Sequence, residues 1–419
     1  MILLFILFCI QPCFSAARSK GNVQDSALDV ELKEFQLDDL NARLHTMEAG
    51  PERDYFAGVV ANRENRITES IRLLSRALPS LRQSNLQRTA IAVRTLQDDY
   101  RKNFQYAAAA RLSDDPKSDD DVLLQILRNT PPQTITWNGP VRLTTERNPL
   151  NSTNVELTVN GVKGPWLLDT GANDSVVSKS FAEKLGLKLL PGAGQTQGMT
   201  GIENPQRVAV LPTLQMGGAT LHNVVVLVLN DTSLNVGFGK KKYQINGIIG
   251  YPVFQALGSI TFLHGGEFVA GERPNIQGTG ARMYMQYMSP VIECNVEGNN
   301  LPFSVDTGAE GTNLFVRYYD RFRGESKTLH WKKGKNKTFG AGGFMKRKIY
   351  LQPRVALGIG DKTAILKNLG IYLSGTGGDA DDLYGTLGQD LVSNFASFTL
   401  DFKAMTFSLG KSLNSDERN

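Results

Sequence analysis

The sequence Asp-Thr-Gly-Ala occurs twice in this chain, at residues 169–172 and again at residues 306–309. The two copies are 137 residues apart, and the apolar residues that precede them match without a gap. Two carboxyl groups held about 3 Å apart repel each other by roughly 5 kcal/mol at an effective dielectric constant near 20. Such a pair shares one proton, so that one carboxyl group can act as a base while the other acts as an acid.

A proton-sharing pair of this kind can hydrolyse an amide without a metal ion. The ionised Asp deprotonates a bridging water, and the protonated Asp polarises the carbonyl group of the substrate. Asp169 and Asp306 are therefore the candidate catalytic residues. The sequence has no zinc-ligand spacing, nucleotide-binding loop or Ser-His-Asp order, and its four histidines are scattered, so we expect neither a metal nor a cofactor.

The residues before each copy predict the elements that position the two carboxyl groups. Residues 166–168 (Trp-Leu-Leu) and 303–305 (Phe-Ser-Val) are typical of strand ends that lead into a tight turn. The third residue of each motif, Gly171 or Gly308, permits backbone angles closed to other residues and the close approach of another chain segment. We therefore expect two equivalent strand–turn units.

The threonines of the two motifs, Thr170 and Thr307, are expected to hold these turns in register. A hydroxyl group both donates and accepts, so each threonine can bond to the opposite turn. A further signature follows each Asp, at residues 247–250 (Gly-Ile-Ile-Gly) and 385–388 (Gly-Thr-Leu-Gly). From the Asp to the last glycine is 81 residues in the first copy and 82 in the second. A two-part motif repeated at matched spacing indicates an internal duplication.

The duplicated motif resembles the aspartic peptidases, and more closely the retropepsin-like branch, in which Asp-Thr-Gly-Ala is usual. In that fold each lobe carries one Asp-Thr-Gly loop and a later hydrophobic-hydrophobic-glycine segment beneath it, to which residues 247–254 and 385–392 are similar. The resemblance covers residues 150–411 and implies an aspartic endopeptidase with an Asp169/Asp306 dyad. Retropepsins are typically homodimers, whereas this chain carries both motifs, which implies a monomeric pseudo-dimer.

The resemblance also implies a glycine-bearing hairpin, the flap, between the two signatures of each lobe. The flaps are expected to close over a peptide or protein substrate bound as an extended strand. The candidate flap residues are Gly198, Met199 and Gly201 in the first lobe and Gly340, Gly342 and Gly343 in the second.

The fourth motif position carries no hydroxyl group in either copy. Ala172 and Ala309 therefore cannot donate a hydrogen bond to an ionised dyad. Since such a bond would lower the pKa of the pair, we predict an activity optimum less acidic than that of pepsin.

Residues 26–128 are rich in Leu, Ala, Arg, Gln and Glu and poor in glycine, and their apolar residues recur at helical spacing. Two segments are similar to each other at an offset of 39 residues, and the later one resembles a tetratricopeptide helix pair. The matched positions are Ala61, Asn65, Ile67 and Ser70 with Tyr100, Phe104, Tyr106 and Ala109. Such a repeat would bind a protein partner, and the alternative is a plain helical bundle that acts as a spacer or propeptide.

Residues 1–17 are typical of a secretory signal peptide, because an apolar run at 2–10 is followed by small residues at 15–17. The run is too short to span a bilayer. We therefore expect an exported protein, located in the periplasm, at the cell surface or outside the cell. Removal of the leader leaves Cys294 as the one cysteine, so no internal disulfide is expected.

The expected fold class is multi-domain α plus β. The helical region (26–128) is followed by a linker (129–149), in which a Pro-Pro pair breaks the helix, and then by two all-β lobes at 150–275 and 280–411. A chain of 419 residues is long enough for this organisation. Its formal charge of +5 is mild and does not indicate nucleic-acid binding.

One segment of the second lobe is strongly basic. Residues 317–348 carry eleven Lys and Arg residues against two acidic residues. Such a run could attract acidic substrates or an anionic surface. A solvated loop is the favoured interpretation.

Three alternatives to the single-chain enzyme stay open. The same fold could be a catalytically silent module that binds peptides or proteins. The enzyme could be active only as an intermolecular dimer, as retropepsins are. The helical region could also cover the cleft of a zymogen until it is removed.

Overall fold

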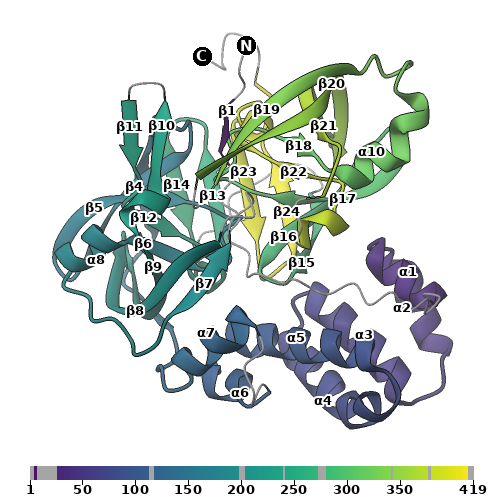
Figure 1. Cartoon of the computed structure of the whole chain (residues 1–419), viewed down its shortest axis with the longest axis horizontal. Helices are drawn as coiled ribbons and strands as arrows, with labels where there is room; N and C mark the ends of the chain where they lie inside the picture. The colour runs from purple at the N-terminus through teal and green to yellow at the C-terminus, as the bar shows by residue number, and fades with distance from the viewer. Residues whose placement is uncertain are drawn as a thin grey trace. The chain divides into compact units, whose positions relative to one another are not determined.

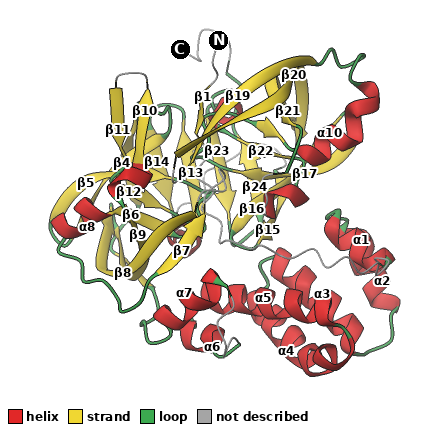
Figure 2. Cartoon of the chain, in the orientation of Figure 1, coloured by secondary structure: helices red, strands yellow, loops and turns green. Residues whose placement is uncertain are grey.

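The computed structural model describes residues 4–6, 26–112, 118–197, 203–238, 241–271, 280–340, 343–375 and 379–413 (Figure 1). Contacts divide the chain into two compact units. A helical unit comprises the described residues within 14–132 together with 284–288, and a β unit comprises the rest. Helices dominate the first unit and strands the second (Figure 2), which confirms the α plus β class.

The helical unit is built from helix hairpins. Its helices in the described residues are α1 (Ala27–Lys33), α2 (Leu37–Thr46), α3 (Pro51–Arg63), α4 (Ile67–Ser84), α5 (Leu86–Lys102), α6 (Tyr106–Ala110) and α7 (Asp119–Leu127). On α4, the apolar spacing seen in the sequence buries Ile67, Leu74 and Leu78. The packing of this apolar face, rather than intrinsic propensity, supplies most of the stability of such helices.

Three helix connections share one turn geometry. Phe35, Asn65 and Phe104 adopt left-handed backbone angles, with φ of 59°, 58° and 55°. The residue after each of them donates its amide to a carbonyl five positions earlier, which closes the preceding helix with a Schellman-type cap. Asn65 and Phe104 are the positions matched at the 39-residue offset, so the sequence similarity reflects a repeated helix–turn–helix. The tetratricopeptide interpretation itself stays a prediction.

The first half of the β unit consists mainly of strands. They are β2 (Thr134–Trp137), β3 (Val141–Arg147), β4 (Thr153–Val159), β5 (Val162–Leu168), β6 (Ser175–Ser178), β7 (Gly194–Gln197), β8 (Glu203–Met216), β9 (Ala219–Leu229), β10 (Asn235–Phe238), β11 (Lys241–Gln244), β12 (Gly247–Ile249), β13 (Ser259–Leu263) and β14 (Glu267–Ala270). The short helices α8 (Lys179–Lys184), η1 (Asp231–Leu234) and α9 (Tyr251–Leu257) lie between them.

The second half follows a similar order. Its strands are β15 (Ala281–Gln286), β16 (Ser289–Val296), β17 (Asn299–Val305), β18 (Asn313–Leu314), β19 (Lys332–Gly340), β20 (Gly343–Ile359), β21 (Lys362–Tyr372), β22 (Gly385–Leu387), β23 (Ser397–Asp401) and β24 (Thr406–Leu409). Its helices are α10 (Val316–Phe322), η2 (Arg323–Glu325), η3 (Asp379–Asp382) and α11 (Gln389–Val392). An additional strand, β1 (Leu4–Ile6), pairs in parallel with β19 within the segment expected to be a leader.

The two halves repeat the same strand pairings. The strand before the first motif, β5, runs parallel to β12, and β17 runs parallel to β22 in the same way. Antiparallel pairing then joins β12 to β6 and β22 to β18. Parallel pairing finally joins β6 to β9 and β18 to β21. The sequence duplication is therefore a duplication of structure.

A sheet joins the two halves. Its strand order is β3–β14–β13–β23–β24–β15, with three strands from each half. At its centre Thr261 lies opposite Thr399, and their hydroxyl groups are 2.8 Å apart. Beside them the rings of Phe262 and Phe398 stack with centroids 4.6 Å apart. This shared sheet fixes one half against the other and so determines how the two Asp turns meet.

Two expectations about segments need correction. The expected linker at 129–149 contains β2 and β3, which pair with β9 and with β14 and β4. Both strands are largely exposed, and Val141 is their one buried residue. The basic run at 317–348 is not a loop but α10, η2 and the β19–β20 hairpin, on which Lys335 lies opposite Lys348 and both are exposed.

Within the described ranges, no helix is long and apolar enough to cross a membrane. The same ranges contain no cluster of three or more His, Cys, Asp or Glu side chains that could hold a metal ion. Cys294 is buried in β16, which fits a packing role for this thiol.

Candidate active site

Each Asp turn is held by the glycine signature of its own half. The amide of Asp169 donates to the Ile249 carbonyl at 3.0 Å, and the amide of Asp306 donates to the Leu387 carbonyl at the same distance. These bonds extend the β5–β12 and β17–β22 pairings by one residue. The spacing of 81 and 82 residues noted in the sequence therefore brings each signature beneath its turn.

The two threonines link the turns by a symmetric set of four hydrogen bonds. The Thr170 hydroxyl donates to the Val305 carbonyl at 2.8 Å and accepts from the Thr307 amide at 3.1 Å. The Thr307 hydroxyl donates to the Leu168 carbonyl at 2.9 Å and accepts from the Thr170 amide at 3.0 Å. All of these groups are buried, so each bond satisfies a polar group that water cannot reach.

Each glycine of the motifs lies directly against the carboxyl group of the opposite turn. A Cβ atom added to Gly171 would lie 2.5 Å from the carboxyl carbon of Asp306. A Cβ atom added to Gly308 would lie 2.5 Å from the carboxyl carbon of Asp169. No side chain fits in that space, so glycine is what allows the two carboxyl groups to come together.

The two carboxyl groups are buried, with relative exposures of 0% for Asp169 and 2% for Asp306. Asp169 Oδ1 accepts from the Gly171 amide at 2.9 Å. Asp306 Oδ1 accepts from the amides of Gly308 at 2.9 Å and Ala309 at 3.0 Å. The Oδ2 atoms have no protein donor in the described part of the chain, while the two carboxyl groups lie within hydrogen-bonding reach of each other.

Burial and mutual repulsion disfavour ionisation of this pair. The pKa of Asp169 is raised well above its usual value by burial and then by the charge of Asp306. Burial also raises the pKa of Asp306, while hydrogen bonds from Asp169 and from the amides of Gly308 and Ala309 oppose that rise. The pair therefore holds a proton at pH values where an exposed Asp has lost it.

Two of the candidate flap residues, Gly340 and Gly343, lie in the described part of the chain. Gly340 and Gly343 face each other at the end of β19–β20. Gly342 lies outside the described residues, as do Gly198, Met199 and Gly201. The described part of the first hairpin, β7–β8, ends with Gln197 opposite Glu203.

Two further side chains contact the backbone of the second Asp turn. The Gln389 side chain donates to the Thr307 carbonyl at 2.7 Å, and the Ser152 hydroxyl donates to the Gly308 carbonyl at 3.3 Å. Gln389 lies within the segment 385–392 noted in the sequence, whereas no motif marks Ser152. The bracing role of both residues is revealed only by these contacts, because bonds to backbone atoms impose no residue pattern at fixed spacing.

The position after each motif differs between the two halves. In the first half Asn173 accepts from the Ser289 hydroxyl at 3.2 Å. In the second half Glu310 follows the motif, and burial together with the charge of Asp390 raises its pKa to about 7. Its Oε2 atom is buried without a hydrogen-bond partner in the described part of the chain. The site is therefore not symmetric in charge.

Comparison with known proteins agrees with this geometry. Residues 155–253, which contain β5, the first Asp turn and the first glycine signature, match the family model for aspartyl proteases. Residues 155–253 are thus similar to the aspartyl proteases. The second Asp turn lies outside the matched segment, but it repeats the sequence and the pairings of the first.

Among solved structures, a retropepsin-like aspartic protease from Rickettsia conorii is similar at 18% sequence identity. The match covers 33% of this chain and 92% of that one, with a TM-score of 0.21, which is too low to support an argument. A search of curated proteins found no match. The aspartyl protease region is thus identified by the family model and by its motifs.

Proposed function

We propose that this protein is an aspartic endopeptidase in which Asp169 and Asp306 form the catalytic dyad. The two halves of the β unit would act as two lobes of a single-chain pseudo-dimer, each supplying one Asp. The observation that carries this proposal is the close contact between each motif glycine and the carboxyl group of the opposite turn. A Cβ atom added to either glycine would lie 2.5 Å from the carbon of that carboxyl group. A surface turn with the same sequence would not need that contact.

The environment of the two carboxyl groups supports different roles for them. Asp306 accepts two backbone hydrogen bonds through Oδ1, which stabilise its anion. Asp169 accepts from the Gly171 amide through its own Oδ1 atom. Because the two carboxyl groups titrate as a coupled pair, the ionised one would activate the water and the protonated one would donate to the substrate carbonyl oxygen.

The chemistry follows from the two Oδ2 atoms that lack protein donors. A water between them loses a proton to the ionised carboxylate as its oxygen attacks the peptide carbonyl. The other carboxyl group gives its proton to the carbonyl oxygen, and a neutral gem-diol results. The newly protonated carboxyl group then gives its proton to the leaving nitrogen, and the other carboxylate takes a proton from a hydroxyl of the gem-diol as the C–N bond breaks. The pair is left with one shared proton again.

The substrate would be an extended segment of a peptide or protein. The edge of β19 supports this, since Leu4–Ile6 pairs with it in parallel as an added strand close to the end of the hairpin. Export is proposed from the leader at residues 1–17 alone. Capture of a protein partner is proposed for the helical unit from its repeated helix hairpins.

The test is hydrolysis of an unfolded protein across pH 3 to 7 by the wild type, Asp169→Asn and Asp306→Asn, with and without pepstatin. We expect activity that pepstatin inhibits and that both substitutions abolish, with an optimum above about pH 3 because the pKa values of the dyad are raised. Absence of cleavage by the wild type at every pH, with peptide binding intact, would instead indicate a silent binding module.

A further inference from the structure

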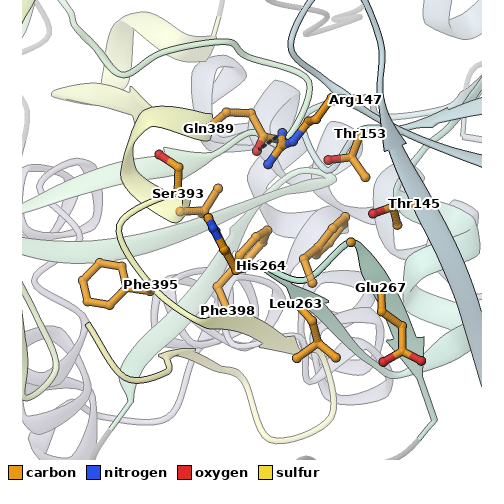
Figure 3. A pocket seen from close by; sticks show the side chains of 13 residues that line it. Thr145, Arg147, Thr153, Leu263, His264, Glu267, Gln389, Ser393, Phe395 and Phe398 are labelled. Atoms are coloured by element: carbon orange, nitrogen blue, oxygen red, sulfur yellow. Dashed lines mark hydrogen bonds between the residues drawn. The ribbon is translucent and has the colours of Figure 1, made fainter. Parts of the chain in front are cut away.

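A polar pocket of about 100 Å³ lies beside the second Asp turn and is lined by both halves of the β unit. The first half contributes the end of β3, the start of β4 and the β13–β14 turn. The second half contributes α11 and the residues that follow it. Figure 3 shows Arg147 at one end of this pocket, against Gln389 and near Thr153.

Arg147 is a cation without a counter-charge. Its Nη1 atom donates to the Gln389 amide oxygen at 2.7 Å and to the Asn151 carbonyl at 3.0 Å. Both acceptors are neutral, and no carboxylate pairs with this guanidinium in the described part of the chain. Burial lowers the pKa of Arg147, although the residue is exposed to solvent on one side. A guanidinium group whose protein partners are neutral can bind an anion through charge-assisted hydrogen bonds.

The rest of the lining favours an oxyanion. A guanidinium group has five N–H donors, so Arg147 keeps unused donors after its bonds from Nη1. Hydroxyl groups of Thr145, Thr153 and Ser393 and the imidazole of His264 line the same cavity. Its acid, Glu267, is already paired with Arg142 at 3.4 Å, so its charge is partly offset.

We propose that this cavity, the Arg147 pocket, is a binding site for a small oxyanion such as phosphate, sulfate or a carboxylate. Arg147 is the main ligand, and its planar fork of donors suits two oxygen atoms of such an anion. The volume of about 100 Å³ fits one anion of this size and excludes a peptide.

The Arg147 pocket is connected to the second Asp turn by one side chain. Gln389 accepts from Arg147 through its amide oxygen and donates to the Thr307 carbonyl through its amide nitrogen. An anion that draws the guanidinium away from Gln389 removes one of the two bonds that orient this amide. Occupancy of the pocket is thereby transmitted to the turn that carries Asp306.

The binding test uses inorganic phosphate, sulfate and acetate in separate titration calorimetry experiments at constant ionic strength, with chloride as the reference ion. We expect the wild type to bind at least one of the three oxyanions and Arg147→Gln to lose at least tenfold in affinity. Arg142→Gln is the matched control, because Arg142 lies on the same strand but is paired with Glu267. It should bind within about twofold of the wild type.

A melting curve in oxyanion-free buffer checks that each variant is folded. If Arg147→Gln does not fold, Arg147→Lys replaces it in the test. Lysine keeps the positive charge but lacks the planar guanidinium donors, so this variant should bind at least threefold more weakly. Equal affinity in the wild type and the Arg147 variant, or no binding of any of the three anions, overturns the proposal. The titration needs no peptidase activity, so it can fail or succeed independently of the proposed function.

The link to the Asp turn has a separate readout. In an active preparation, the bound oxyanion should change the hydrolysis rate of the wild type and of Arg142→Gln but not that of Arg147→Gln. A rate change of equal size in all three proteins would contradict transmission through Gln389.

Discussion

At the scale of single residues, the site depends on two glycines that are packed directly against two carboxyl groups. Neither glycine can be replaced by a larger residue without displacing the opposite carboxyl group. Gly171 and Gly308 lie against the opposite Asp, and both Asp side chains are buried. The closeness that the proposed catalysis needs also makes ionisation of the two carboxyl groups costly. Function and local stability therefore oppose each other at these positions.

A methyl group at Gly308 should separate the two carboxyl groups. Since its Cβ atom would lie 2.5 Å from the carboxyl carbon of Asp169, we expect Gly308→Ala to lose at least a hundredfold in hydrolysis rate. Overpacking of this kind also destabilises by roughly 1–3 kcal/mol. Gly324→Ala is the control, because nothing lies within 4 Å of that Cβ position. Comparable activity in the two variants would contradict the geometry.

The dyad should also make stability depend on pH. Its pKa values are raised in the folded state, so the folded state binds more protons than the unfolded state above pH 4 or so. Stability is therefore present at low pH and is lost as the pH rises through the raised pKa values. Asp306→Asn removes one ionisation and should be more stable than the wild type at pH 7 by about 1–3 kcal/mol.

Denaturant unfolding at pH 4 and pH 7 measures this difference. The gap between variant and wild type should shrink at pH 4, where the wild-type pair is protonated. A variant that is less stable than the wild type at pH 7 would show that the two carboxyl groups do not repel each other in the folded protein.

At the scale of elements, the two strand–turn units have equivalent pairings and are hydrogen-bonded to each other. The turns follow β5 and β17, rest on β12 and β22, and are joined by the two threonine hydroxyls. The sequence predicted the turns, the tie through threonine and the repetition, because all three are local or repeated patterns. It did not predict β2 and β3, whose side chains are largely exposed.

The threonine tie can be tested by a change that preserves shape. Thr170→Val removes a hydroxyl that donates to Val305 and accepts from Thr307, both in buried positions. Leaving such groups unpaired costs about 1–3 kcal/mol each, so we expect a clear loss of melting temperature and of activity. Thr170→Ser keeps the hydroxyl and should retain most of both. Equal loss in the two variants would assign the effect to packing instead.

At the scale of the whole molecule, both Asp turns belong to one chain and are joined by the shared sheet centred on Thr261 and Thr399. If the dyad is intramolecular, a mixture of Asp169→Asn and Asp306→Asn should stay inactive after unfolding and refolding together. Pairing of lobes between chains would instead regenerate intact dyads in the mixture. Specific activity that is independent of enzyme concentration is the accompanying expectation.

The sequence by itself indicated the two buried Asp residues, the threonines, the glycines and the repeat, because a duplicated motif specifies the same local geometry twice at a fixed spacing. The tertiary structure alone decided which segments brace that motif. Gln389, Ser152 and Arg147 reach the second Asp turn through bonds to backbone atoms or to one another, at sequence distances of up to 242 residues. Such contacts depend on how the chain folds back on itself, and no local pattern of residue types encodes them.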